Sequence, residues 1–260
     1  MSKTINYEEK SKSLILLQNK FMNVVFKNNL ALTSFVLRII LKKKDLDVTY
    51  ANVQEHFPNL KGHSVFLDIF ARDSDNKEYN IEIQRRKDGS EAKRARYHSS
   101  LMDCNMLKEG QDPTDLMETY VIFITERDYL NKNLPLFSVD RRITETGEQF
   151  NDGAHIIYVN GADQNSSTEL GKLMHDFQEP DPDKMYFKEV SESVRYYKET
   201  KEGQNAMRDV FDEIEMEVKQ ENSIEIAMNL IADEVSLEKV SQYTGLSIDQ
   251  VRELANSKAS

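Results

Sequence analysis

The sequence is poor in the features that mark disulfide-rich, zinc-binding and membrane-spanning proteins. Its 260 residues include one cysteine, Cys104, and no tryptophan. A single cysteine excludes an internal disulfide framework and a zinc site built on cysteines. The chain has no apolar run of about 18 residues, so we expect neither a spanning helix nor a membrane partner. The opening residues MSKTINYEEK lack the apolar segment of a signal peptide, and we therefore expect a cytoplasmic protein.

The formal charge of the chain is −11, but this charge is unevenly distributed. Residues 179–260 carry 19 acids and 10 bases, whereas residues 85–98 carry six Lys or Arg against two acids. A local excess of cations beside acidic side chains is suited to bind the phosphate backbone of a nucleic acid. The plainer interpretation is a solvated helix face, and charge alone leaves both open.

The main functional signal in the sequence is a pair of carboxylates, each inside a short apolar segment that we expect to be a strand. Asp68 lies within VFLDIF, residues 65–70, and Glu82 lies between Ile81 and Ile83. A carboxylate with apolar residues on both sides is costly to bury unless an opposite charge neutralises it. Neither apolar segment contains Lys or Arg, so we expect the neutralising charge to be a metal ion. Oxygen ligands of this kind suit Mg²⁺ or Mn²⁺.

Strand alternation constrains the turn between these two segments. Because side chains alternate between the faces of a strand, Asn80, Glu82 and Gln84 share one face. Asp68 joins that face only with an odd number of turn residues or a bulge. A three-residue turn at 75–77 would place Asp68 opposite Gln84, as would a five-residue turn with the same centre. A two-residue turn would put Asp68 on the wrong face.

The remaining pattern alternates between strands and helices. Apolar spacing predicts helices over residues 9–27, 30–43, 166–178 and from 185 onward, and one from Ser90, its expected N-cap, to about Lys108. Strands are expected over residues 64–72, 79–85, 120–125, 136–139 and 155–159. This order predicts an α/β fold with a mixed central β-sheet flanked by helices. We expect a core domain over residues 1–180, N-terminal helices included, and an acidic helical C-terminal extension over residues 181–260.

Several segments together resemble a known family. An aspartate followed after 13 residues by Glu-Ile-Gln, and then by KRARYHSS in a basic helix, is similar to the PD-(D/E)XK nuclease superfamily. The closer resemblance, over roughly residues 15–200, is to its bacterial recombination-promoting nuclease and transposase family. The matching segments, in order, are NNLALTSFVLRIIL, NIEIQRR, RARYHSSLMD, ETYVIFITE, GAHIIYVNG and GKLMHDF. The resemblance implies a restriction-endonuclease-like core.

The same resemblance implies a metal-dependent DNA endonuclease that hydrolyses phosphodiester bonds, acting in DNA recombination or mobile-element biology. It implies Asp68, Glu82 and the backbone carbonyl of Ile83 as ligands of Mg²⁺ or Mn²⁺. Gln84 stands where the superfamily usually has Lys, so Asp68, Glu82 and Gln84 are the expected catalytic residues. The side chains expected to contact DNA phosphates are Arg85, Arg86, Lys93, Arg94, Arg96 and Tyr97.

Each of these assignments has an alternative. Glu82 and Arg94 can form a structural salt bridge, and Gln84 can be a solvent-facing strand residue. Many members of the superfamily have an additional acid on the first helix, where this chain offers Asn19 and Asn23. These departures support a second hypothesis, in which the protein is a catalytically weak or inactive relative that binds DNA or a protein partner.

The C-terminal segment SLEKVSQYTGLSIDQVREL, residues 236–254, has the outline of a helix-turn-helix with Ser247 as a cap. Its second helix contains few cations, whereas DNA recognition normally brings several to the phosphate backbone. We therefore expect the C-terminal helices to serve in packing, in homo-oligomer formation or in contact with a partner.

Overall fold

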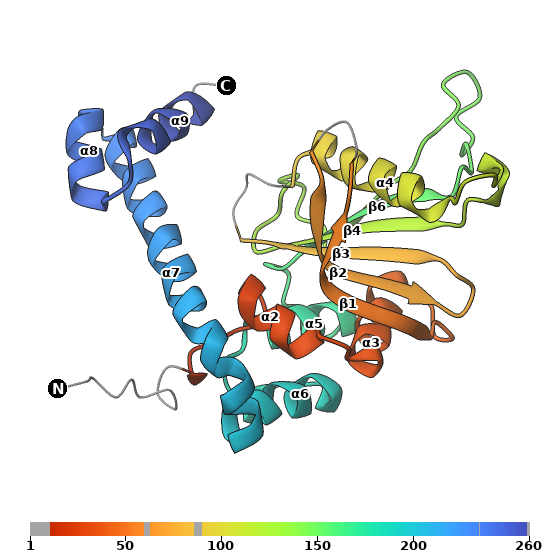
Figure 1. The fold of residues 1–260 in the computed structure, drawn as a ribbon, viewed down its shortest axis with the longest axis horizontal. Coiled ribbons are helices and arrows are strands. Elements are labelled where there is room, and N and C mark those ends of the chain that lie inside the picture. Colours follow the sequence, from red (N-terminus) through yellow and green to blue (C-terminus); the bar gives the residue numbers. More distant parts are fainter. Residues whose placement is uncertain (1–10, 60–62, 86–89, 234, 259–260) are drawn as a thin grey trace. The chain divides into compact units, whose positions relative to one another are not determined.

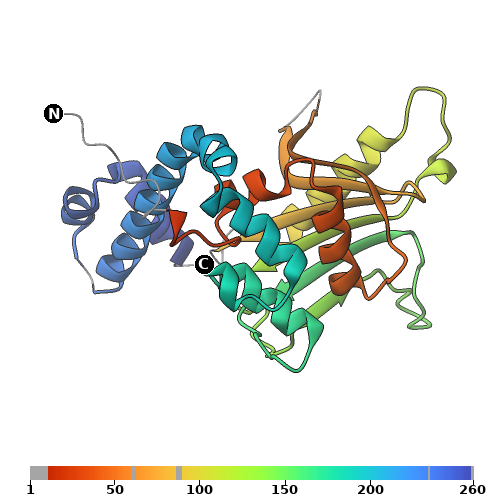
Figure 2. The same ribbon diagram turned by 90° about the horizontal axis from the view of Figure 1, so that it is seen from below.

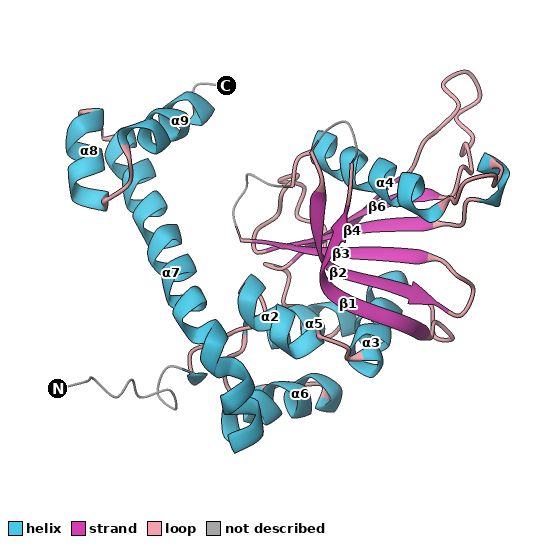
Figure 3. Cartoon of the chain, in the orientation of Figure 1, coloured by secondary structure: helices cyan, strands magenta, loops and turns pink. Residues whose placement is uncertain are grey.

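The computed structural model describes residues 11–59, 63–85, 90–233 and 235–258, and its centre is a six-stranded sheet (Figures 1 and 3). The strands are β1 (Val48–Phe57), β2 (Val65–Asp73), β3 (Glu78–Gln84), β4 (Thr119–Thr125), β5 (Leu136–Val139) and β6 (Ala154–Asn160). Their order in the sheet is β1-β2-β3-β4-β6-β5. The pairs β3–β4 and β4–β6 are parallel, and the other three are antiparallel. The sheet is therefore mixed.

Helices cover both faces of this sheet. Helix α4 (Ala92–Met106) lies on one face, and α2 (Asn19–Phe26), α3 (Leu30–Leu41) and α5 (Glu169–Gln178) lie on the other (Figures 1 and 2). The later helices are α6 (Lys188–Glu199), α7 (Lys201–Ala232), α8 (Leu237–Thr244) and α9 (Ile248–Lys258). Two short 3-10 helices occupy Pro113–Asp115 and Pro182–Lys184. This arrangement confirms the predicted α/β, restriction-endonuclease-like fold.

The centre of the sheet is apolar on both faces. Every residue of β4 is buried, as its unbroken apolar sequence predicts for a strand between two parallel neighbours. On the α4 face, one core cluster joins strand and helix residues; its buried members are Phe57, Leu67, Phe70, Ala95, Met102, Val121, Phe123 and Tyr158. This packing holds α4 against the sheet and so fixes the position of the side chains that α4 directs toward β3.

The helix starts follow ordinary capping chemistry, with one correction. Asn29 caps α3 by accepting from the Leu32 backbone nitrogen at 3.1 Å. For α4, Ser90 was the expected N-cap, but the cap residue is Glu91, and no side chain caps that helix. Ser90 is fully buried, and its carbonyl accepts a hydrogen bond from the Tyr158 hydroxyl at 2.8 Å. Tertiary packing against β6 therefore outweighs the local capping preference.

Two other expectations about elements differ from the structure. Strand β1 is absent from the predicted strands, because VTYANVQEHF lacks a strict alternation of apolar and polar residues. Its interior residue Gln54 also has a left-handed φ of +52°. The helix expected over residues 9–27 is shorter, since α2 begins at Asn19 and residues 12–18 form turns and irregular backbone. Residues 9 and 10 lie outside the described part of the chain.

The chain divides into two compact units, residues 1–207 and residues 208–260. The expected boundary lay at residues 180 and 181, before α6. In the structure α6 packs on α2 and α3, and Val190 and Val194 are fully buried. Burial of these apolar side chains places α6 in the first unit despite its polar composition.

The second unit has a small core of its own. Its buried residues come from α7, α8 and α9, and they are Ile224, Ala227, Val240, Leu246 and Val251. Gly245 ends α8 with a left-handed φ of 73°. Ser247 and Gln250 then cap α9 reciprocally, with the Ser247 Oγ accepting from the Gln250 nitrogen at 3.2 Å.

No single helix among the described residues is long and apolar enough to cross a membrane. Helices α2 and α3 reach the required length and composition only as a pair bent by 116°. Both helices are largely buried within the first unit.

Candidate active site

The turn between β2 and β3 sets which residues face each other. The Asp73 nitrogen donates to the Lys77 carbonyl at 3.1 Å, so three residues, 74–76, form the turn. Asp73 Oδ1 accepts from the backbone nitrogens of Asp75 and Lys77, each at 2.9 Å, and Asn76 adopts a left-handed φ of 62°. These contacts place the centre of the turn one residue earlier than we expected.

The odd turn length is therefore confirmed, but the predicted register is wrong. The β2–β3 ladder runs from Arg72–Glu78 to Ile69–Ile81. Continued by one step, this register places Asp68 opposite Glu82 rather than opposite Gln84. The two carboxylates thus become direct cross-strand neighbours.

Where β2 and β3 separate, the carboxylates of Asp68 and Glu82 accept hydrogen bonds from backbone N–H groups of the opposite strand. The Asp68 nitrogen donates to Glu82 Oε1 at 3.3 Å, and the Ile83 nitrogen donates to Asp68 Oδ2 at 3.2 Å. Asp68 is only 7% exposed and Glu82 only 1%. Both acids are thus buried and held face to face by main-chain contacts.

Asp68 also receives hydrogen bonds from two distant segments. Gln54 of β1 donates through Nε2 to Asp68 Oδ1 at 3.1 Å, and the side chain of Asn19 at the start of α2 forms a further hydrogen bond. Burial, together with the charge of Glu82, raises the pKa of Asp68 to about 7 despite these donors. Asp68 therefore holds a proton up to near-neutral pH.

Glu82 has the opposite surroundings, because two groups of α4 face it. Arg94 Nη2 lies 3.5 Å from Glu82 Oε2, and His98 Nδ1 lies 3.5 Å from Oε1. Burial alone would raise the pKa of Glu82, but His98 and Arg94 outweigh it and hold this pKa below its usual value. The pair is thus asymmetric, with Glu82 the ionised member.

His98 has two competing partners at one ring nitrogen. Its Nδ1 lies 3.1 Å from the Asn80 amide nitrogen and 3.5 Å from Glu82 Oε1. An unprotonated Nδ1 accepts from Asn80, whereas a protonated Nδ1 donates to Glu82. His98 is 2% exposed, so it orients Glu82 from within the core between α4 and the sheet.

The six expected phosphate-binding residues are placed differently from one another. Arg94 reaches Glu82, so the structural salt bridge expected as the alternative is present. Arg85 lies 3.6 Å from Glu126 at the end of β4. Lys93 and Arg96 are exposed on α4, and neither has an ion pair within the described residues. Arg86 lies outside the described part of the chain.

The side chains of Tyr97 and Gln84 form no hydrogen bond to the carboxylates within the described residues. The Tyr97 hydroxyl donates to the carbonyl of His63 and accepts from Asn59 Nδ2 at 2.9 Å, so it ties α4 to the loop after β1. Gln84 is half-buried at the end of β3, and its carbonyl accepts from the Glu126 nitrogen at 3.0 Å. Their roles toward DNA and water stay predictions.

Three residues at this site were not among the predicted ones. Asn19, Gln54 and His98 contact the carboxylates from α2, β1 and α4. The sequence signals were weak: Asn19 occupies the first-helix position where an acid was sought, and His98 lies in the basic segment. Gln54 gives no signal, because only tertiary pairing of β1 brings it to Asp68.

One of the comparisons with known proteins found a match. The family model described as PD-(D/E)XK nuclease family transposase matches residues 20–233. The chain belongs to this family. No curated protein and no solved structure matches the chain.

Membership in the PD-(D/E)XK nuclease family transposases implies nuclease hydrolase activity in general. The matched range includes every predicted site residue from Asp68 to Tyr97. It also extends through α6 and to the end of α7, beyond the core domain expected from the sequence.

The carboxylate pair fits the divalent metal that PD-(D/E)XK nucleases typically use. Glu82 Oε2 is buried without a hydrogen-bond partner among the described residues, and Asp68 carries a proton that a cation would displace. Within that part of the chain, no group of three or more His, Cys, Asp or Glu side chains is placed to hold a metal ion, although His98 contacts Glu82. A bound Mg²⁺ or Mn²⁺ would therefore take its other ligands from backbone carbonyls, phosphate oxygens and water.

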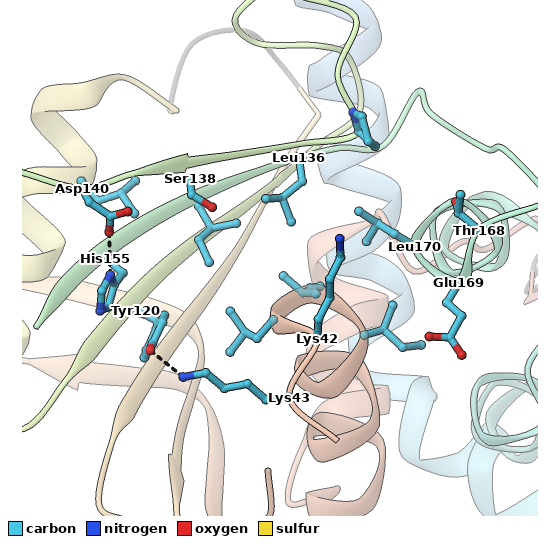
Figure 4. A pocket seen from close by; sticks show the side chains of 16 residues that line it. Lys42, Lys43, Tyr120, Leu136, Ser138, Asp140, His155, Thr168, Glu169 and Leu170 are labelled. Atoms are coloured by element: carbon cyan, nitrogen blue, oxygen red, sulfur yellow. Dashed lines mark hydrogen bonds and ion pairs between the residues drawn. The ribbon is translucent and has the colours of Figure 1, made fainter. Parts of the chain in front are cut away.

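A separate cavity of about 610 Å³ lies between the end of α3, the start of α5 and strands β4 to β6 (Figure 4). Lys43 Nζ lies 2.7 Å from the Tyr120 hydroxyl at its edge, and His155 Nδ1 lies 2.6 Å from Asp140 Oδ1. None of the predicted site residues lines this cavity. We place the candidate site at the carboxylate pair, because that pair lies in the segment whose sequence resembles the acidic motif of the superfamily and this cavity does not include it.

Proposed function

We propose that the protein is a metal-dependent DNA endonuclease that hydrolyses phosphodiester bonds. The observation that supports this most directly is the buried pair Asp68 and Glu82 at the point where β2 and β3 separate. Two buried carboxylates in contact are costly unless a proton or a cation is shared between them. A structural salt bridge to Arg94 would compensate Glu82, whereas the hydrogen bonds of the Asp68 carboxyl group within the described residues are with amide groups and a backbone N–H.

Each residue at the carboxylate pair would have a separate role in hydrolysis. Asp68, Glu82 and the Ile83 carbonyl would hold Mg²⁺ or Mn²⁺. Such an ion activates water and polarises phosphoryl oxygens. His98 would orient Glu82 from the core. Gln84 would position the attacking water by hydrogen bonds.

Helix α4 would bind the substrate backbone. The Arg94 side chain is 44% exposed while its guanidinium contacts Glu82, so it can reach a phosphate beside the carboxylates. Lys93 and Arg96 present further cations on the same helix. The negative charge of the chain is concentrated after residue 178, and α4 lies outside that segment.

A second candidate is a weak or inactive relative that binds DNA or a protein partner. Three observations favour it: Arg94 and His98 already compensate Glu82, Gln84 carries no charge, and Asn19 stands where an acid was sought. Metal binding separates the two candidates. Calorimetric titration with Mn²⁺ should give a heat that the Asp68→Asn protein lacks, and absence of binding to the wild type would favour the second candidate.

The test of activity is cleavage of supercoiled plasmid in Mg²⁺ or Mn²⁺. Asp68→Asn should abolish cleavage and leave the circular dichroism spectrum unchanged, because the amide matches the carboxyl group in size but cannot ionise to bind a cation. Asp75→Asn is the matched control, since Asp75 is exposed in the turn of the same hairpin. Cleavage by Asp68→Asn at the wild-type rate would remove this residue from the site.

A further inference from the structure

Two aromatic rings lie beside the carboxylate pair and have no part in the proposed hydrolysis. Phe66 of β2 is 58% exposed, and His56 of β1 lies beside it. Their ring centroids are 4.8 Å apart, and the rings are tilted by 33°. Single exposed apolar side chains are common, so the position of this pair carries the argument rather than its exposure.

The aromatic pair and the carboxylate site lie two residues apart on the same two strands. His56 and Phe66 are cross-strand partners in the β1–β2 ladder, and Glu55 and Leu67 are the next pair. One residue beyond that pair, the side chains of Gln54 and Asp68 are hydrogen-bonded at 3.1 Å. Two residues of a strand span about 7 Å. The backbone positions of Phe66 and Asp68 are therefore about 7 Å apart, so one nucleotide can contact both residues.

Helix α4 brings cations to the same region. Its residue Tyr97 is hydrogen-bonded to His63 and Asn59, in the loop between β1 and β2. This contact holds α4, with its exposed cations Lys93 and Arg96, against the loop that joins the two strands, while Val65 and Leu67 on either side of Phe66 pack into the core cluster of the α4 face. Proteins that bind unpaired nucleic-acid strands combine such cations with exposed aromatic rings.

The nearby acid of β1 is turned away from this surface. Glu55 Oε2 accepts from Asn52 Nδ2 at 2.5 Å and from the Tyr50 hydroxyl at 3.3 Å. Its charge is thus engaged along β1. A DNA strand that reaches Phe66 would not have to displace a carboxylate at that ring.

We propose that Phe66, supported from behind by His56, stacks on an unpaired DNA base next to the phosphate that is cleaved. This inference rests on the proposed endonuclease function and adds a substrate class, namely single-stranded or locally unpaired DNA. In an intact duplex both faces of each base are stacked on neighbours, so a protein ring gains access only where the strand is open or a base is extruded.

The experiment measures binding of the full chain to a short single-stranded DNA that contains one 2-aminopurine. EDTA is present, so no cleavage occurs and the readout is independent of activity. Phe66→Ala should weaken binding by about 5- to 150-fold, the usual effect of losing one base–aromatic stack. It should also abolish the change in 2-aminopurine fluorescence, and Phe66→Trp should restore both. Affinity for a fully paired duplex should change little.

Two further variants serve as controls. One tests whether any apolar side chain at position 66 suffices, and the other tests whether removing any exposed aromatic ring has the same effect. Phe66→Leu keeps an apolar side chain without an aromatic face, and it should behave like Phe66→Ala. Phe150→Ala is the matched control, since Phe150 is 59% exposed in the segment between β5 and β6, and it should bind like the wild type.

The possible failures are distinguishable. Wild-type fluorescence and affinity in Phe66→Ala would overturn the stacking role even if Asp68-dependent cleavage is found. Altered oligomeric state in Phe66→Ala with unchanged DNA binding would assign the ring to a contact between copies and would also overturn it. Absence of cleavage by the wild type, with the stacking signal intact, would instead contradict only the proposed endonuclease function.

Discussion

Gln84 is the residue at which the site departs from the motif of its superfamily. It follows Glu82 by two residues at the end of β3 and is half-buried. Its backbone carbonyl accepts from the Glu126 nitrogen at 3.0 Å, so the strand conformation there does not depend on its side chain. Substitutions of Gln84 therefore test the side chain alone.

We expect Gln84→Lys to cleave plasmid at the wild-type rate or faster. The added cation would lie near the attacked phosphate and stabilise the charge that develops there, while its stem packs on the strand. Gln84→Ala should lower the rate by up to about 10²-fold, as for the loss of one donor to a transition state. Equal rates for all three proteins over a range of Mg²⁺ concentrations would show that Gln84 has no catalytic role.

Gln54 combines backbone strain with a contact to the site. Its φ of +52° is a left-handed conformation that costs a non-glycine residue roughly 1–2 kcal/mol. Its side chain donates to Asp68. Gln54→Gly should therefore leave the free energy of unfolding within about 1 kcal/mol of wild type, because relief of strain offsets the lost hydrogen bond. Plasmid cleavage should nevertheless fall.

Asn76→Gly is the matched control for that substitution. Asn76 also has a left-handed φ, of 62°, but it lies in the turn between β2 and β3. It should be neutral or stabilising in urea denaturation and should not change cleavage. If Gln54→Gly cleaves as fast as Asn76→Gly, Gln54 does not position Asp68.

At the scale of elements, strand alternation was the most productive signal in the sequence. It required an odd turn between β2 and β3, which the structure has. The exact position of the turn, and with it the strand register, could not be predicted. The Asp73 side chain fixes the turn one residue earlier than expected, and nothing in the sequence distinguishes Asp73 from the other acidic and polar residues of that segment. The pairing of Asp68 with Glu82 instead of Gln84 follows from that one side chain.

The other parts of the site depend on tertiary packing that no local pattern encodes. Strand β1 is an edge strand with polar residues on it, so its periodicity is weak, yet it supplies Gln54. The amide of Asn19 reaches Asp68 only because α2 packs on β1 and β2. The acidic, polar composition after residue 180 led us to expect a domain boundary before α6. That helix is polar on one side only, and on the other side Val190 and Val194 are buried.

Helix α6 is tied to the first unit by a buried cation. Lys198 is 6% exposed, and its Nζ donates to the carbonyls of Leu14, at 2.7 Å, and Pro180. No carboxylate within the described residues lies at ion-pair distance from this Nζ. Burial lowers the pKa of Lys198 to about 8, from an ordinary value of 10.5.

This shift predicts a pH dependence of stability. Between about pH 8 and pH 10.5 the unfolded chain keeps a proton that the folded protein releases, so the contribution of Lys198 to stability rises with pH. Relative to Lys198→Met, the wild type should gain about 1 kcal/mol of unfolding free energy between pH 7.5 and 9.5 in urea denaturation. Lys188→Met, at an exposed position of the same helix, should show no such change relative to the wild type. A constant difference between wild type and Lys198→Met would mean that Lys198 is not desolvated.

At the scale of the whole molecule, the protein is two units that share one helix. The first unit, residues 1–207, contains the sheet and every candidate site residue within the described part of the chain. The second, residues 208–260, is a small cluster of α7, α8 and α9 side chains. In α9, Arg252 is 3.3 Å from Asp249, which leaves little cationic charge for DNA recognition and fits a role in packing or partner contact.

The first turns of α7 belong to the first unit, so the position of a truncation should matter. Met207 is 1% exposed, and Gln204 Nε2 donates to the Lys198 carbonyl at 2.8 Å. A chain ending at residue 207 should unfold cooperatively in urea and retain plasmid cleavage, because it keeps both contacts and the whole site. A chain ending at residue 202 should be less stable by about 2–4 kcal/mol, since it loses the burial of Met207 and the hydrogen bond of Gln204. Equal stability of the two chains would place the boundary before α7, and an unfolded 1–207 chain would show that the second unit is required for folding of the first.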